Sequence, residues 1–195
     1  MAILENYSRA MLASAVTLTQ NTNAYLSVLH AAIERHGSPK KIVTDGGGIF
    51  RSDRAKAVYR ALNIEKEEIE RGQAWQSFIE TNFNVQRRMA DFYFARAESW
   101  EELVAEHDLW LERHNTQRHQ AHEGREDGRR SPSEVLGPVR VVRYHPVDLE
   151  RAFFSRAGSP GSWTLSGTLV SGIGGCMPRK GSPANRWLSG SATTD

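Results

Sequence analysis

The chain of 195 residues has a single cysteine, Cys176, and a formal net charge of only +2. One cysteine cannot form an internal disulfide framework or supply a cysteine-rich zinc site, and it fits a reducing compartment. The small net charge excludes a polybasic protein that binds nucleic acid over its whole surface. Any DNA affinity must therefore come from local patches.

Long hydrophobic runs and a leader pattern are missing as well. No apolar run approaches the roughly 20 residues that a membrane-spanning helix needs. The N-terminus lacks the order of basic, hydrophobic and small residues that marks a signal peptide. We therefore expect a soluble, cytoplasmic protein without a membrane partner, built as one domain of ordinary size plus an appendage.

Strand-like and helix-like patterns alternate through the first part of the chain. Turn formers at Asn6 and Ser8 separate two apolar segments and predict an antiparallel hairpin. Apolar residues at helical spacing alternate further along with short strand patterns. The predicted strands are 1–5, 10–18, 40–44 (buried) and 64–69, and the predicted helices are 21–36 and 53–62, the latter capped by Asp53. This alternation predicts an α/β layered domain.

Two longer helices are predicted next, over 75–95 and 99–114. Their predicted core residues are Phe78, Ile79, Phe83, Met89, Phe92 and Tyr93 in the first helix, and Trp100, Leu103, Val104, His107, Trp110 and Leu111 in the second. The polar run 115–130 predicts a surface loop, in which Arg118 and His119 are expected to anchor the closing segment to the core. Ser131 and Pro132 then open a short helix.

The composition changes after residue 157, where Gly, Ser and Thr dominate and no Asp or Glu precedes Asp195. A flexible, irregular tail explains this composition. A segment translated out of its ancestral reading frame explains it equally well, because natural tails seldom lose every acid so abruptly. Both interpretations stay open at this point.

Two acids lie where a metal site for phosphoryl transfer would need them. The apolar run Ile42-Val43-Thr44 ends on Asp45 and is followed by three glycines, and Glu80 lies near the start of the helix predicted over 75–95. A strand-end acid and a helix acid can meet in space and bind a divalent cation together. Taken alone, Asp45 is more simply a turn residue and Glu80 a solvated charge.

Five segments in order resemble the retroviral-integrase-like DDE transposases of bacterial insertion sequences. They are Asn6-Tyr7-Ser8-Arg9, the run from Lys41 to Phe50, Gly72-Gln73-Ala74-Trp75 with Phe78-Ile79-Glu80, Asn115-Thr116-Gln117-Arg118-His119, and Ser131-Pro132-Ser133-Glu134-Val135-Leu136. Thirty-four residues separate Asp45 from Glu80, close to the family spacing of about thirty-five between its last two metal-binding acids. The resemblance covers about residues 1–138.

The resemblance implies a ribonuclease-H-like mixed sheet flanked by helices. It also implies DNA cleavage and strand transfer through two Mg²⁺ (or Mn²⁺) ions held by three carboxylates, with Asp45 and Glu80 as catalytic, metal-binding acids. The implied partners are insertion-sequence ends and target DNA, together with a homo-oligomer or a full-length transposase. On this basis residues 1–138 form the catalytic core, with a helical closing segment over 99–138, and residues 139–195 form a linker and a low-order tail.

The departure from the family pattern concerns its first acid, which lies on a strand upstream of the Tyr-Ser-Arg turn. That strand would precede Met1, and Glu5 is a poor substitute for its acid. We therefore expect a sheet without its first strand, weak Mg²⁺ binding by two carboxylates alone, and a truncated, inactive transposase. The alternative is a non-catalytic module that binds DNA or assembles with a transposase.

Three polar residues on the helix that carries Glu80 are candidates for DNA contacts. Asn84, Arg87 and Arg88 can reach phosphates from this helix, although a solvated face explains them about as well. The histidines near residue 119 lack cysteine partners and sit in a predicted loop, so we do not expect a zinc site there.

Overall fold

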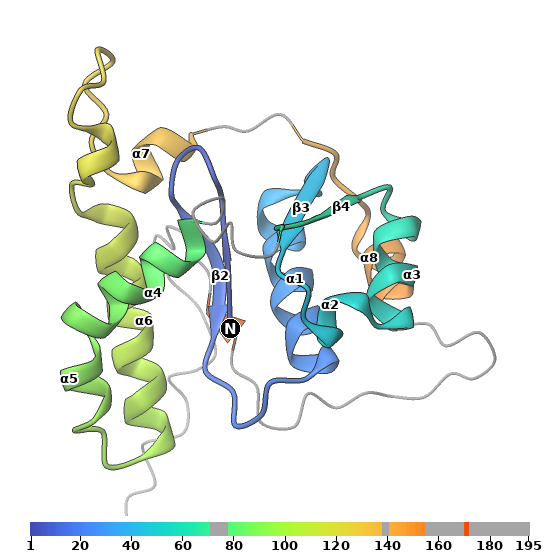
Figure 1. The fold of residues 1–195 in the computed structure, drawn as a ribbon, viewed down its shortest axis with the longest axis horizontal. Coiled ribbons are helices and arrows are strands. Elements are labelled where there is room, and N and C mark those ends of the chain that lie inside the picture. The colour runs from blue at the N-terminus through green and yellow to red at the C-terminus, as the bar shows by residue number, and fades with distance from the viewer. Residues whose placement is uncertain (71–77, 138–140, 155–169, 172–195) are drawn as a thin grey trace, which may run out of the picture.

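The computed structural model describes residues 1–70, 78–137, 141–154 and 170–171 (Figure 1). Strands β1 (Ala2–Leu4) and β2 (Met11–Ala15) pair antiparallel, which confirms the predicted hairpin. Strand β5 (Val170–Ser171) pairs with the other edge of β2, so the first sheet has the order β1-β2-β5. The tail predicted after residue 157 otherwise lies outside the described residues.

Helix α1 (Thr22–His36) is the central helix of the fold. It begins where the Asn21 side chain accepts a hydrogen bond from the Ala24 amide at 2.9 Å, and it ends at Gly37, whose φ of 88° suits glycine. One set of its buried residues packs toward the first sheet, and another packs toward helices on its far side. The predicted helix over 21–36 is confirmed.

A second sheet pairs β3 (Lys41–Thr44) in parallel with β4 (Glu65–Glu68). Helices α2 (Gly48–Arg51) and α3 (Asp53–Ala61) connect the two strands. The prediction that the first of these strands is buried is wrong, because its Lys41 and Val43 are exposed. The cap of α3 is Ser52, which accepts a hydrogen bond from the Ala55 amide, and Asp53 is the first helical residue.

The described strands therefore form two separate sheets, β1-β2-β5 and β3-β4, as Figure 1 shows. Both sheets rest on the same hydrophobic cluster, since Ile3 of β1 and Ile42 of β3 pack against the residues around Leu26 and Leu29 of α1. The architecture is a mixed α/β fold whose sheet is divided into two parts over a shared core.

Helices α4 (Phe78–Met89), α5 (Asp91–Phe94) and α6 (Trp100–Thr116) cover one side of the first sheet (Figure 1). The single helix predicted over 75–95 is wrong, because it breaks at Ala90, which is buried against Trp110 and Leu111. Residues 75–77 of the predicted helix lie outside the described residues, and α4 is described from Phe78 onward. Four of the six predicted core residues are in fact exposed, namely Phe78, Met89, Phe92 and Tyr93.

Helix α6 follows its prediction more closely. Ser99 caps it by accepting the Glu102 amide, and Val104, His107, Trp110 and Leu111 are buried. The 3₁₀ helix η2 (Gln120–His122) and helix α7 (Pro132–Leu136) come next. Ser131 and Glu134 form the reciprocal capping box of α7, which confirms the predicted helix start.

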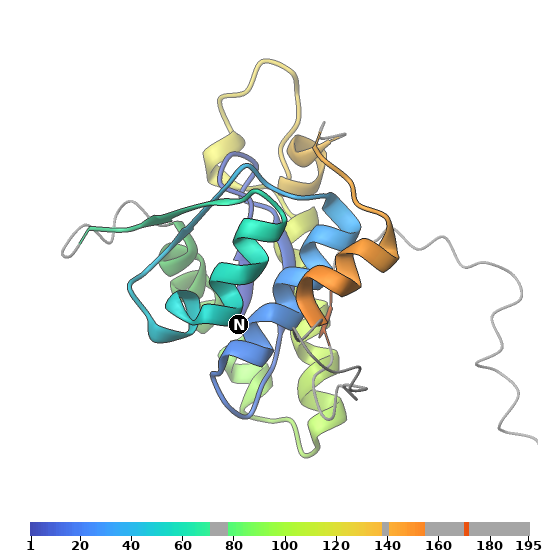
Figure 2. The ribbon, with the colours of Figure 1, turned by 90° about the vertical axis from the view of Figure 1, so that its right-hand side faces the viewer.

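Helix α8 (Pro146–Phe154) lies in the region where the sequence indicated a linker. Its Leu149 and Phe153 are buried in the main cluster, and Figure 2 shows α8 packed beside α1 and α3. The Tyr144 hydroxyl also donates to the Leu62 carbonyl at 2.9 Å. The sequence pattern did not predict this helix. Among the described helices, none has the length and apolar character needed to cross a membrane.

Candidate functional site

Asp45 follows the last residue of β3 and is exposed. Its carboxylate oxygen Oδ1 accepts a hydrogen bond from the Gly47 amide at 2.9 Å, which closes a turn of the Asx type. A side chain at Gly47 would place its Cβ 2.8 Å from this oxygen, so glycine at this position allows the turn. Asp45 therefore has a structural role in ending β3, whatever else it does.

Glu68 at the end of β4 is the neighbouring strand-end acid, and the sequence analysis did not select it. Its carboxylate forms ion pairs with Arg51 of α2 and Lys66 of β4. Hydrogen bonds from Arg51 and then from Lys66 lower the pKa of Glu68 to about 2. Because both cations already neutralise this carboxylate, Glu68 is poorly placed to serve as a metal ligand.

Glu80 lies in the first turn of α4, with its side chain exposed. Ile79, the residue before it, packs toward the cluster that contains Met11, and Asn82 is buried with its amide 3.6 Å from the Met11 sulfur. Through Ile79 and Asn82, the first turns of α4 therefore pack against the first sheet, while Glu80 stays exposed. The predicted loop Gly72 to Trp75, which leads into this helix, lies outside the described residues.

The predicted DNA-contacting residues share the exposed face of α4. Asn84, Arg87 and Arg88 are all exposed, and the Arg87 guanidinium donates to the Asn84 side-chain oxygen at 2.9 Å. Glu80 lies one turn before Asn84 on the same helix face, as the spacing predicts. The structure therefore leaves these cations accessible without assigning them a ligand.

Glu5 is bound within the hairpin turn. Its carboxylate accepts hydrogen bonds from the Tyr7 amide, the Ser8 amide and the Ser8 hydroxyl, at 3.0, 2.6 and 2.5 Å. Burial works against ionisation of this group, but these hydrogen bonds outweigh it and lower the pKa of Glu5. Glu5 organises the turn and has little capacity left to replace a missing metal ligand.

A row of side chains from α6 and η2 holds the hairpin in place. The His114 and His122 rings donate through Nε2 to the carbonyls of Arg9 and Ser8, at 2.9 and 2.8 Å. The Asn115 side chain accepts the Met11 amide at 2.9 Å.

The surface-loop prediction for 115–130 is therefore wrong at Asn115 and His122, which are both buried. Arg118, one of the two predicted anchors, is exposed. Nothing in the spacing of this polar run distinguishes the buried residues from the exposed ones. A buried asparagine or histidine whose partner is the main chain of a distant strand leaves no local pattern.

The described residues do not fit a complete divalent-metal site. Among them, no group of three or more His, Cys, Asp or Glu side chains is placed to hold a metal ion. Asp45 and Glu80 come from different elements, both are exposed, and Asp45 already uses one oxygen within its own turn. Two such carboxylates supply less than the oxygen set that Mg²⁺ or Mn²⁺ prefers.

Comparisons with known proteins give a likeness of fold and no match in sequence. No protein-family model matches the chain, and no curated protein matches it. Among solved structures, it is similar to a chain of the simian T-cell lymphotropic virus intasome, determined in complex with the PP2A regulatory subunit B56 gamma. The TM-score is 0.54 at 17% identity, and the match covers 70% of this chain and 47% of the viral chain. The chain thus spans about half the length of the viral chain, and the likeness concerns the fold alone.

Proposed function

We propose that this chain is the core of a DNA strand-transfer protein of the integrase and transposase type, with a ribonuclease-H-like arrangement and an incomplete metal site. The fold likeness to the intasome chain is the observation that carries this proposal. The five ordered motifs support it independently, because a sequence motif does not depend on the likeness of fold. Its partners are DNA and further copies of the same or a related transposase.

Asp45 and Glu80 are the two acids of the proposed site. The first follows the carboxyl end of β3, and the second lies in the first turn of α4, which places one on a strand end and one on a helix. A bound Mg²⁺ or Mn²⁺ pair would supply a nucleophile and stabilise the leaving oxygen. With two exposed carboxylates, we propose that this chain binds the ions weakly if at all and is catalytically inactive.

A nicking assay on supercoiled plasmid tests this proposal, with Mg²⁺ or Mn²⁺ and the unmodified chain. The comparison variants are Asp45→Ala and Glu80→Ala, and Asp53→Ala serves as a matched control because it removes an exposed acid from the first turn of α3. We expect no nicking above the level of these variants. Robust nicking by the unmodified chain, lost in Asp45→Ala and Glu80→Ala and kept in Asp53→Ala, would establish an active enzyme. It would contradict the proposal that this chain is inactive.

A non-catalytic DNA-binding module is the second candidate, favoured by the accessible Arg87 and Arg88 on α4. Fluorescence anisotropy with a labelled duplex tests it across a salt series. If these arginines contact phosphates, Arg87→Glu with Arg88→Glu weakens DNA binding. The slope of the logarithm of the binding constant against the logarithm of the salt concentration also becomes shallower by about two. Lys56→Glu with Arg60→Glu, two exposed changes on α3, controls for the same change of net charge. Equal loss in the control and the α4 variant would exclude a specific role for α4.

A further inference from the structure

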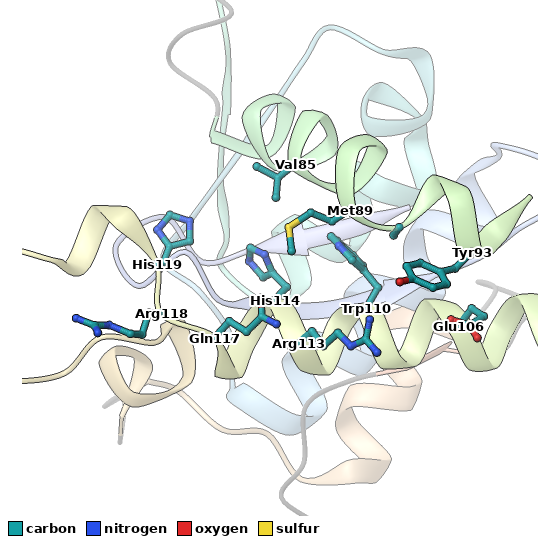
Figure 3. Close-up of a pocket in the computed structure, with 11 residues that line it drawn as sticks. Val85, Met89, Tyr93, Glu106, Trp110, Arg113, His114, Gln117, Arg118 and His119 are labelled. Carbon is teal, nitrogen blue, oxygen red and sulfur yellow. The ribbon is translucent and has the colours of Figure 1, made fainter.

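A pocket lies between α4, α5, α6 and the residues that follow α6 (Figure 3). Its volume is about 100 Å³. The residues that line it are Val85, Met89, Ala90, Tyr93, Glu106, Trp110, Arg113, His114, Gln117, Arg118 and His119. An apolar cavity of ~150 Å³ holds a benzene ring, so this one has room for a single aliphatic side chain.

The interior of the pocket is mostly apolar. In Figure 3 the side chains of Met89, Trp110 and His114 point toward the same space, with Val85 above them. The Trp110 and His114 rings pack at 5.7 Å between centroids. The Trp110 ring is almost wholly buried and forms a firm wall, whereas the flexible Met89 side chain can adapt to an incoming group.

Apolar surface continues beyond the mouth of the pocket. Met89, Phe92, Tyr93 and Leu109 are exposed by 50%, 64%, 45% and 44%. The Phe92 ring packs edge-on against Tyr93, and Leu109 shares a face of α6 with the pocket residues Glu106 and Arg113. Large apolar side chains gathered around a pocket are typical of a surface that another protein covers.

The charged residues of the pocket are arranged unevenly. Figure 3 shows Arg118 and His119 at one end and Glu106 at the opposite end, with Arg113 between them. Neither Arg113 nor Arg118 forms an ion pair with a carboxylate of another described residue, unlike Arg51 and Arg125. The pocket therefore presents two guanidinium groups to which a ligand carboxylate can bind.

We propose that this pocket is a docking site for an acidic segment of a partner protein. One aliphatic side chain of that segment enters between Met89 and Trp110, and separate acidic residues on either side of it bind Arg113 and Arg118. The surrounding apolar surface is wider than a small molecule in a cavity of about 100 Å³ could cover, which favours a protein. The mostly apolar interior disfavours a nucleic acid backbone at this position, because a phosphate would lose its hydration there.

Isotope-labelled methionine methyl groups report on the pocket directly, because Met89 lines it, and Met1, which packs against the clusters around α1 outside the pocket lining, is an internal reference. The probes are two synthetic peptides in which leucine and phenylalanine alternate with glutamate or, in the control, with lysine. We expect the acidic peptide to shift the Met89 signal and leave the Met1 signal unchanged, and the basic peptide to shift neither.

Anisotropy of the labelled acidic peptide then tests the role of charge. We expect Arg113→Glu and Arg118→Glu each to weaken binding about fivefold, the loss of one exposed ion pair. Arg60→Glu has the same change of charge on α3 and should leave the affinity unchanged. Met89→Glu should abolish binding, and circular dichroism confirms that each variant keeps its fold.

Three results would overturn the proposal. The first is a Met89 signal that neither peptide shifts at millimolar concentration. The second is equal binding of the basic peptide, or displacement of the acidic peptide by duplex DNA, which would identify a nucleic-acid surface. The third is a Met89 shift that depends on protein concentration alone, together with dimers in sedimentation, which would assign the pocket to a second copy of this chain.

Discussion

At the scale of single residues, Asn115 is the most informative position. It is fully buried at the end of α6 and bonds to the main chain of two elements. Its side chain accepts the Met11 amide and donates to the Leu111 carbonyl, both at 2.9 Å. The Met11 amide lies beside the bulge between β1 and β2, so Asn115 supplies a partner that the strand pairing leaves out.

We predict that Asn115→Ala destabilises the fold by about 2–3 kcal/mol, because it leaves the buried Met11 amide without a partner. Urea denaturation followed by circular dichroism measures the change. Asn84→Ala is the matched control, since this exposed asparagine bonds only to Arg87 among the described residues. The control should cost no more than about 0.5 kcal/mol. Equal losses in the two variants would contradict the anchoring role of Asn115.

At the scale of elements, the free edges of β1 and β3 are the unusual feature. Met1 hydrogen-bonds to Ala15 of β2 and Glu5 to Ala10 just before it, so by alternation Ile3 also faces β2 and Leu4 faces away. The Lys40 and Thr44 carbonyls accept from β4, so even-numbered residues of β3 face β4 and the Val43 amide faces away. The outer edges of β1 and β3 thus each present a row of peptide groups that no described strand pairs with.

We predict that hydrogen exchange is faster at the Leu4 amide than at Ile3, and faster at Val43 than at Thr44. Amides within a strand ladder exchange through opening of the pair, whereas amides at a free edge exchange with water directly. Residue-resolved exchange by nuclear magnetic resonance checks this, after correction for intrinsic rates. Equal protection of Leu4 and Ile3 would mean that another strand covers the edge of β1.

At the scale of the whole molecule, buried histidines couple stability to pH. Burial lowers the pKa of His107, which is 5% exposed, and this effect exceeds the opposing pull of the Asp108 carboxylate. Its Nε2 lies 2.8 Å from the Ser14 hydroxyl and joins α6 to β2. Burial also lowers the pKa of His114 in the same interface.

We predict that the free energy of unfolding falls as the pH decreases below about 6.5, the pKa of histidine in an unfolded chain. The unfolded state binds protons there while the folded state with its lowered pKa does not, so acid favours unfolding. At pH 5.5 the contribution of His107 is at most about 1.4 kcal/mol. Urea titrations at pH 7.5 and 5.5 measure it, and His107→Gln should flatten the dependence. An equal change in the free energy of unfolding between the two pH values for the parent and His107→Gln would show that His107 is not the source of the pH dependence.

Local signals predicted the elements that local chemistry controls. Asn21, Ser99 and Ser131 cap the helices that the sequence places after them, and the hairpin forms about its predicted turn. The amphipathic pattern of 75–95 was misleading because apolar spacing alone cannot show which side of a helix will be covered. Tertiary packing broke that helix at Ala90 and left Phe92 exposed.

The candidate site also combines features that the sequence predicted with features that only the tertiary structure shows. Residue type, spacing and the family resemblance together selected Asp45 and Glu80, and the strand before Asp45 and the helix that carries Glu80 exist. Their metal-binding role stays a proposal. The Glu68 pairs with Arg51 and Lys66 could not be predicted from sequence, because β4 is rich in charges of both signs and only strand pairing brings one of its acids to α2.

The sequence by itself determined the α/β alternation and the starts of α1, α6 and α7, since each depends on residues a few positions apart, and it proposed the two candidate acids through the family resemblance. The tertiary structure decided that the described strands form two sheets, that α8 completes the core, and that a pocket opens beside Trp110. These features join residues far apart in the chain through side-chain packing and main-chain pairing. Packing over such separations depends on the whole fold, and no local pattern encodes it.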